Sequence, residues 1–164
     1  YDPVPDFTYG FNIYLEYKNF DFTAFFQGVQ GVDIISDLKR ETDIWAGLNI
    51  GFLNKGHRLL NAWCVDNPSS NIPAVTLSDN NNEKRVSTYW VENGSYLKLR
   101  TIQLGYNLPQ NIVSKLSMQR LRMYVSAQNL FTIKSSSFTG VDPENPNYGY
   151  PIPLNITFGL NVTF

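Results

Sequence analysis

The sequence predicts an all-β fold, specifically a five-strand piece of an antiparallel transmembrane β-barrel. The last eleven residues, Leu154 to Phe164, carry a large apolar side chain at every second position, with Asn, Thr or Gly between them. Because successive side chains of a strand point to opposite faces, this segment has one apolar face and one polar face. A tilted strand of about 9 to 11 residues is long enough to cross a bilayer.

A second segment near the start of the chain has the same pattern. Apolar side chains stand at six alternate positions from Phe7 to Tyr17. Strands of soluble sandwiches usually run only about 5 to 6 residues. The length of the two alternating segments therefore favours a strand that spans a membrane.

Five strands are expected in all, at about residues 7–18, 20–34, 95–108, 120–133 and 153–164. Their connections alternate in length, with a tight turn at Asn19, a very long loop at 36–89, a short connection at 109–119 and a medium loop at 134–150. Outer-membrane barrels have short periplasmic turns and longer outer loops. The loops 36–89 and 134–150 are therefore expected to be extracellular.

The strand at 95–108 breaks its own alternation. Leu97 and Leu99 fall on odd positions, whereas Ile102 and Leu104 fall on even ones. One extra residue in the strand would return both sets to the same face, so we expect a β-bulge near Arg100. After Pro109 the sequence suggests a single helical turn.

Charge and composition exclude several functions. Thirteen basic and fourteen acidic residues are scattered along the chain, which leaves no basic stripe for nucleic acid. One His and one Cys cannot build a nucleophilic triad or a thiolate metal site, so we expect no enzyme activity, no metal and no cofactor. The carboxylates of Asp142 and Glu144 lie in a loop and lack the regular spacing of a calcium loop, so turn capping is expected there.

Several segments of the chain match a known family, namely Phe11–Ile34, Tyr89–Pro109, Arg120–Ile133, the loop Gly140–Glu144 and the terminal Phe164. They resemble the SusC/RagA-type TonB-dependent transporters of Bacteroidetes outer membranes. The stretch Tyr89–Pro109 is the most specific of them, and the resemblance covers nearly the whole chain.

The resemblance implies that residues 1–164 are the C-terminal portion of a plugged barrel of about 22 strands. The chain opens on Tyr1, without an initiator Met or an apolar signal segment, and we expect it to be a piece of something longer. The family's plug domain and its TonB-contacting segment have no counterpart here, so the TonB complex is expected to act through parts absent from this chain.

The family resemblance further implies active import of a bulky nutrient, an oligosaccharide or a peptide. A SusD-like surface lipoprotein is the expected partner, and the expected location is the outer membrane of a Gram-negative, Bacteroidetes-like cell, in contact with outer-membrane lipid. Two other functions stay open. One is a soluble β-sandwich carbohydrate-binding module, in which the apolar face would be a core. The other is a passive porin.

Substrate contacts are expected from loop aromatics and from polar residues of the lumen, because sugar rings stack on aromatic faces while polar groups fix their orientation. The candidates are Trp63, Tyr89, Trp90 and Asn93 in the loop region, with Arg100 and Arg122 below them. The alternative for the tryptophans is that they only anchor their loops. The alternative for the arginines is pairing with carboxylates of the barrel or plug.

Overall fold

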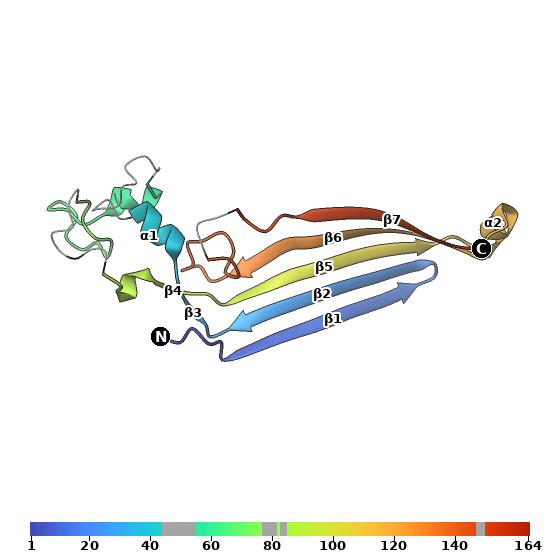
Figure 1. Ribbon diagram of the computed structural model, residues 1–164, viewed down its shortest axis with the longest axis horizontal. Coiled ribbons are helices and arrows are strands. Elements are labelled where there is room, and N and C mark those ends of the chain that lie inside the picture. Colours follow the sequence, from blue (N-terminus) through green and yellow to red (C-terminus); the bar gives the residue numbers. More distant parts are fainter. Residues whose placement is uncertain (44–54, 77–81, 83–84, 147–149) are drawn as a thin grey trace.

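A five-stranded antiparallel sheet is the main element of the computed structural model, which describes residues 1–43, 55–76, 82, 85–146 and 150–164. The sheet has the order β1-β2-β5-β6-β7 and is open in this chain (Figure 1). Its strands are β1 (Phe7–Tyr17), β2 (Phe20–Gln30), β5 (Tyr96–Asn107), β6 (Arg120–Lys134) and β7 (Asn155–Thr163).

Short connections lie at one end of this sheet (Figure 1). Strands β1 and β2 are joined by a two-residue turn, in which Lys18 takes the left-handed conformation with φ 54°. Strands β5 and β6 are joined by α2 (Gln110–Val113) and the 3₁₀ turn η3 (Ser114–Leu116). The helical turn predicted after Pro109 is therefore present.

The long connections lie at the opposite end, together with the N-terminus (Figure 1). They contain α1 (Asp37–Asp43), the 3₁₀ turns η1 (His57–Asn61) and η2 (Thr88–Trp90), and a small second sheet of β3 (Asp33–Ile35) and β4 (Val91–Asn93). The strand predicted at 20–34 is thus two strands. Gly31 has φ 71°, which ends β2 and turns residues 33–35 toward β4.

The register aligns the apolar residues of all five strands in rows on one face. One row contains Leu15, Phe22, Leu104, Val125 and Phe158, and the next contains Ile13, Ala24, Ile102, Ala127 and Ile156. Within the described residues this face stays open, with Phe158 81 % and Leu160 67 % exposed. No helix among the described residues is long and apolar enough to cross a membrane.

A bulge at Arg100 preserves this apolar face along the whole of β5. On β2, Phe25 and Phe26 are consecutive, but their partners on β5 are Thr101 and Leu99, so Arg100 is the extra residue. The predicted bulge is confirmed. As a result, Leu99 rejoins the apolar face opposite Phe26, while Lys98 turns to the polar face.

The polar face carries an ion pair above a glycine. The Arg122 Nε–H donates to Oδ1 of Asp21 at 2.9 Å, and a second guanidinium nitrogen contacts the other carboxylate oxygen. Gly105 is paired with Asp21 on β2 and with Tyr124 on β6, two residues along β6 from Arg122. A Cβ at position 105 would lie 2.5 Å from both Asp21 oxygens and would also collide with Arg122.

We therefore predict that Gly105→Ala destabilises the protein by about 1–3 kcal/mol, because the added methyl group displaces the ion pair. The free energy of unfolding of the full-length protein in detergent is the measurement. Gly10→Ala is the control, since its added Cβ would meet the Phe25 ring at 3.2 Å and the Phe26 carbonyl at 3.3 Å, which is tight but is not the 2.5 Å collision found at position 105. An equal loss in the two variants would contradict the prediction.

Candidate functional site

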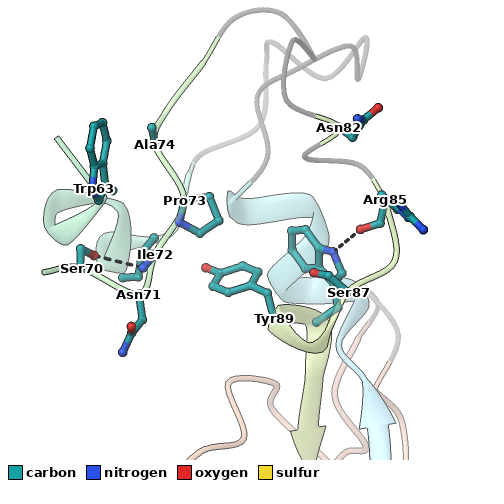
Figure 2. Close-up of a pocket in the computed structure, with 11 residues that line it drawn as sticks. Trp63, Ser70, Asn71, Ile72, Pro73, Ala74, Asn82, Arg85, Ser87 and Tyr89 are labelled. Atoms are coloured by element: carbon teal, nitrogen blue, oxygen red, sulfur yellow. Dashed lines mark hydrogen bonds between the residues drawn. The ribbon is translucent and has the colours of Figure 1, made fainter. Parts of the chain in front are cut away.

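A pocket of about 620 Å³ lies in the loop region, between the segment 70–74 and η2 (Figure 2). Its apolar walls come from Trp63, Ile72, Pro73, Tyr89 and Trp90. Small-ligand sites in proteins typically enclose about 300–1,000 Å³ and combine apolar walls with a few polar groups. The pocket has the size and the composition of such a site.

The 3₁₀ turn η2 supplies the aromatic wall. The ring centroids of Tyr89 and Trp90 lie 4.8 Å apart and their planes cross at 82°, an arrangement that aromatic pairs favour. The Trp90 Nε1–H donates to the Arg85 carbonyl at 3.1 Å (Figure 2), and the Tyr89 hydroxyl donates to Asp43 at 2.6 Å. Both polar atoms are therefore bonded within the protein. The Trp90 side chain is only 4 % exposed, so it mainly anchors the loop beside the Tyr89 ring.

Asp43, the last residue of α1, fixes the Tyr89 ring. Its carboxylate is buried and accepts hydrogen bonds from Arg58 Nε at 2.6 and 2.7 Å and from Thr42 Oγ1 at 3.0 Å. The Lys39 ammonium lies 4.0 Å from the Tyr89 ring centroid. Burial raises the pKa of the Tyr89 hydroxyl, and the hydrogen bond to Asp43 raises it further, so the hydroxyl remains a donor. Burial also lowers the pKa of Lys39.

The opposite wall is a folded-back segment of the same long loop. The Trp63 amide donates to the Ile72 carbonyl at 2.9 Å, and the Ile72 amide donates to Ser70 Oγ at 3.0 Å. The Ser70 hydroxyl in turn donates to the Asn61 carbonyl at 2.5 Å. These bonds hold the Trp63 side chain at the pocket while 45 % of its surface stays exposed.

A second feature attaches the loop 134–150 to the polar face of β5. It is a cluster of charged side chains, called the charge clasp below, and consists of Lys98, Arg100, Asp142 and Glu144. The Lys98 ammonium is 1 % exposed and contacts Asp142 at 2.7 Å and Glu144 at 2.6 Å. Arg100 also pairs with Glu144, and its Nε–H donates to Gln27 at 2.9 Å. The ammonium of Lys98 thus lies where the carboxylates of this loop converge.

The two loops are also joined to each other. Glu92 of β4 is 4 % exposed and accepts hydrogen bonds from the Thr139 amide at 3.0 Å and the Thr139 hydroxyl at 2.8 Å. Lys39 of α1 lies 3.7 Å from the same carboxylate. A continuous set of polar contacts therefore runs from the Tyr89 wall of the pocket to the loop 134–150.

The structure brings together three of the six residues that the sequence singled out. Trp63, Tyr89 and Trp90 line the one pocket described above. Asn93 lies in β4, paired with Asp33, and its side chain accepts a hydrogen bond from the Ser95 amide at 2.8 Å. Arg100 and Arg122 lie on the polar face of the sheet, each paired with a carboxylate of this chain.

Several pocket residues were not among the sequence candidates. Asn71, Asn82, Arg85 and Ser87 line the pocket but belong to a polar stretch without periodicity. The only sequence signal near them is the apolar pair Ile72-Pro73 within that stretch. Their convergence depends on the fold of the loop and not on sequence spacing.

The fold and this site define a class of protein. It is an antiparallel sheet with one apolar face of the kind that contacts lipid, and it carries a pocket in its long loop. Comparison with known proteins makes this more specific. The chain is 37 % identical to TonB-dependent receptor P3 of Formosa agariphila, over 99 % of this chain and 17 % of that receptor. It is 27 % identical to TonB-dependent receptor SusC of Bacteroides thetaiotaomicron, over 99 % of this chain and 15 % of SusC.

Solved structures give the same result. The fold matches the RagAB peptide importer in its open-open state with a TM-score of 0.79 and 28 % identity, over 98 % of this chain and 17 % of that one. No family model matches the sequence. The chain is homologous to the SusC/RagA-type TonB-dependent receptors, and it spans about 17 % of the length of receptor P3 and of the RagAB chain. These relatives are receptors and importers, not enzymes.

We predict that Glu144→Gln loosens the loop 134–150, because it removes the charge that pairs with both Lys98 and Arg100. Hydrogen bonds to charged groups contribute about 1.5–3 kcal/mol, so backbone amides in residues 139–146 should exchange with solvent at least about tenfold faster. Hydrogen exchange read by mass spectrometry is the measurement. Asp66→Asn, at an exposed position of the other loop, is the control.

Acid should have the same effect as the substitution. Burial by itself raises the pKa of the Glu144 carboxyl, but the hydrogen bonds from Lys98, Tyr96 and Arg100 outweigh burial and hold the pKa below its ordinary value. The pairing therefore stabilises the loop fully above the ordinary glutamate pKa, and this stabilisation is lost as the pH falls through the lowered pKa of Glu144. Unchanged amide hydrogen exchange in the Glu144→Gln variant at neutral pH would contradict the role given to the charge clasp.

Proposed function

We propose that this chain is part of the barrel wall of an outer-membrane, TonB-dependent importer of a bulky nutrient. In this proposal residues 1–164 form the C-terminal portion of a plugged barrel of about 22 strands. The nutrient is an oligosaccharide or a peptide. The location is the outer membrane of a Gram-negative, Bacteroidetes-like cell.

The observation that carries the proposal is the division of the sheet into two chemically different faces. Apolar side chains of all five strands form continuous rows on one face, as lipid contact requires. The ion pairs Asp21–Arg122 and Lys98–Asp142 lie on the other face, as in a polar lumen. Strands of 9 to 15 residues have the length that a tilted crossing needs.

The connections support an orientation for the barrel. The two-residue turn at 18–19 and the short helix α2 lie at one end of the sheet, and the long loops lie at the other (Figure 1). Short turns are periplasmic in outer-membrane barrels and long loops are extracellular. The pocket and the charge clasp then lie on the outer side, where a nutrient arrives.

The relatives suggest the partners. TonB-dependent receptors take their energy from the TonB system, which would engage parts of the protein absent from this chain. The name RagAB describes a two-component peptide importer, which supports a SusD-like lipoprotein as the second component here. We include both partners in the proposal.

The soluble β-sandwich alternative requires a second sheet over Phe158, Leu160 and Val162. In the part of the chain that the structure describes, the second sheet has only the three-residue strands β3 and β4, and Phe158 remains 81 % exposed. No observation favours this alternative. The uptake experiment below distinguishes a passive porin from an energised importer.

We predict that Phe158→Arg destabilises the folded protein in membranes by about 2–4 kcal/mol, because a charge on the lipid side of a barrel strand must leave water. The neighbouring Thr157 points to the polar face, so Thr157→Arg is the matched control, and a change within about 0.5 kcal/mol is expected there. The fraction that stays folded on heating in outer-membrane vesicles is the measurement. Equal effects of the two substitutions would contradict a lipid-facing surface.

Uptake is the direct test of import. Deleting the gene of the full-length protein and deleting TonB should each abolish growth on the transported nutrient, because transport against a gradient requires both. Growth of the two deletion strains on single purified glycans and peptides is compared with that of the parent. Growth that survives loss of TonB but not loss of the receptor would show a passive pore instead.

A further inference from the structure

We propose that the long loop 36–89 and the loop 134–150 open and close together as one unit, and that Thr139 is the residue that couples them. The proposal goes beyond the proposed function, because it concerns the motion of the loops and requires neither import nor a bound nutrient. One hydroxyl group carries it, since the Thr139 side chain contacts both stems of the long loop at once.

The long loop is connected to the sheet by two stems. The first stem runs from β3 into α1, and the second runs from η2 into β4, which continues into β5. The stems are bonded to each other, because β3 pairs with β4 and the Ser36 amide donates to the Trp90 carbonyl at 3.0 Å. Ser36 Oγ also accepts a hydrogen bond from the Lys39 amide of α1 at 3.2 Å. A displacement of one stem is therefore transmitted to the other.

Thr139 of the loop 134–150 lies across these two stems. Its hydroxyl donates to the Glu92 carboxylate of the second stem at 2.8 Å, and its amide donates to the same carboxylate at 3.0 Å. Its hydroxyl oxygen is also 3.3 Å from Ser36 Oγ of the first stem. Because the Thr139 proton is directed at Glu92, the Ser36 hydroxyl is the donor in this second contact.

Burial makes these contacts costly to lose. Ser36 is fully buried and Glu92 is 4 % exposed. A hydrogen bond to a carboxylate is stronger than one between neutral groups, and a buried polar group that loses its partner carries the full cost of desolvation. Removal of Thr139 from the stems would leave both the Ser36 hydroxyl and the Glu92 carboxylate short of a partner, so separation of the two loops is opposed.

The segment around Thr139 is itself held together. The Phe138 ring is 4 % exposed and lies against Gly140, where an added Cβ would collide with it. The Lys134 ammonium lies 5.1 Å from the centroid of the same ring and donates to the Gly140 carbonyl. Asp142 of the charge clasp follows two residues later. Opening of the clasp therefore displaces Thr139 as well.

These contacts predict cooperative opening. Segments that share their stabilising contacts open as one unit, and an interaction that orders one part of the unit lowers the cost of ordering the rest. Such a coupling is reciprocal. The two loops lie at the same end of the sheet (Figure 1), so a molecule that orders either loop also orders the other.

Hydrogen exchange of the purified full-length protein in detergent, read by mass spectrometry, tests the coupling. Thr139→Val keeps the shape of the side chain and removes the hydroxyl. Backbone amides of α1 and of residues 138–142 should both exchange about tenfold faster or more, although α1 itself is unchanged in sequence. Thr139 is exposed and lies outside the five-stranded sheet, so the amides of β2 and β5 should exchange at the parental rate.

Ser137→Ala is the matched control. Ser137 is an exposed residue of the same loop, and its hydroxyl is 2.9 Å from that of Ser135, within the loop. The variant therefore removes a hydroxyl without removing a contact to the stems. Exchange in α1 should stay within about twofold of the parent.

A double variant separates coupling from a local effect. Glu144 pairs with Lys98 and Arg100 of β5. Glu144→Gln should nevertheless speed exchange in α1 by about threefold or more, and this effect should disappear when Thr139→Val is also present. Parental exchange of α1 in Thr139→Val, equal acceleration of α1 by Ser137→Ala, acceleration that extends to β2 and β5, or the same effect of Glu144→Gln on α1 in both backgrounds would each overturn the proposal.

Discussion

One extra residue, Arg100, keeps the leucines of β5 on the apolar face of the sheet and Lys98 on the polar face. Side chains alternate strictly along a strand, so a change of register by one residue moves every later side chain to the other face. Without the bulge, Leu99 would face the polar side and Lys98 would face the apolar rows. The buried contacts of Lys98 with Asp142 and Glu144, and with them the attachment of the loop 134–150, depend on this single irregularity.

The loop attachment connects the sheet to the pocket. Thr139 lies three residues before Asp142, and it binds Glu92, which is three residues after Tyr89. The long loop is therefore held to the loop 134–150, which is itself fixed to the polar face of β5. This arrangement gives a site made of irregular backbone the positional support that sites built on strands normally have.

The alternating pattern was enough to predict the five long strands and the bulge, because lipid and lumen impose a two-residue period on every strand. It failed at the end of β2, since the alternation continues through Val32 and Ile34 while the chain turns at Gly31. The pocket was only partly accessible to sequence reasoning. The aromatic residues were conspicuous, but the contact of Tyr89 with Asp43, across 46 positions, leaves no periodic signal.

The outermost position of β1 and β7 in the sheet has a consequence for the isolated polypeptide. Each of these strands has a neighbour on one side only within the described residues, so a row of amide and carbonyl groups lacks a strand partner on the other side. Strand β7 contains no charged residue to discourage misassembly. Unpaired edge strands of this kind readily form hydrogen bonds with strands of other chains. Produced alone, this stretch would expose two unpaired sheet edges and be prone to associate with further copies of itself.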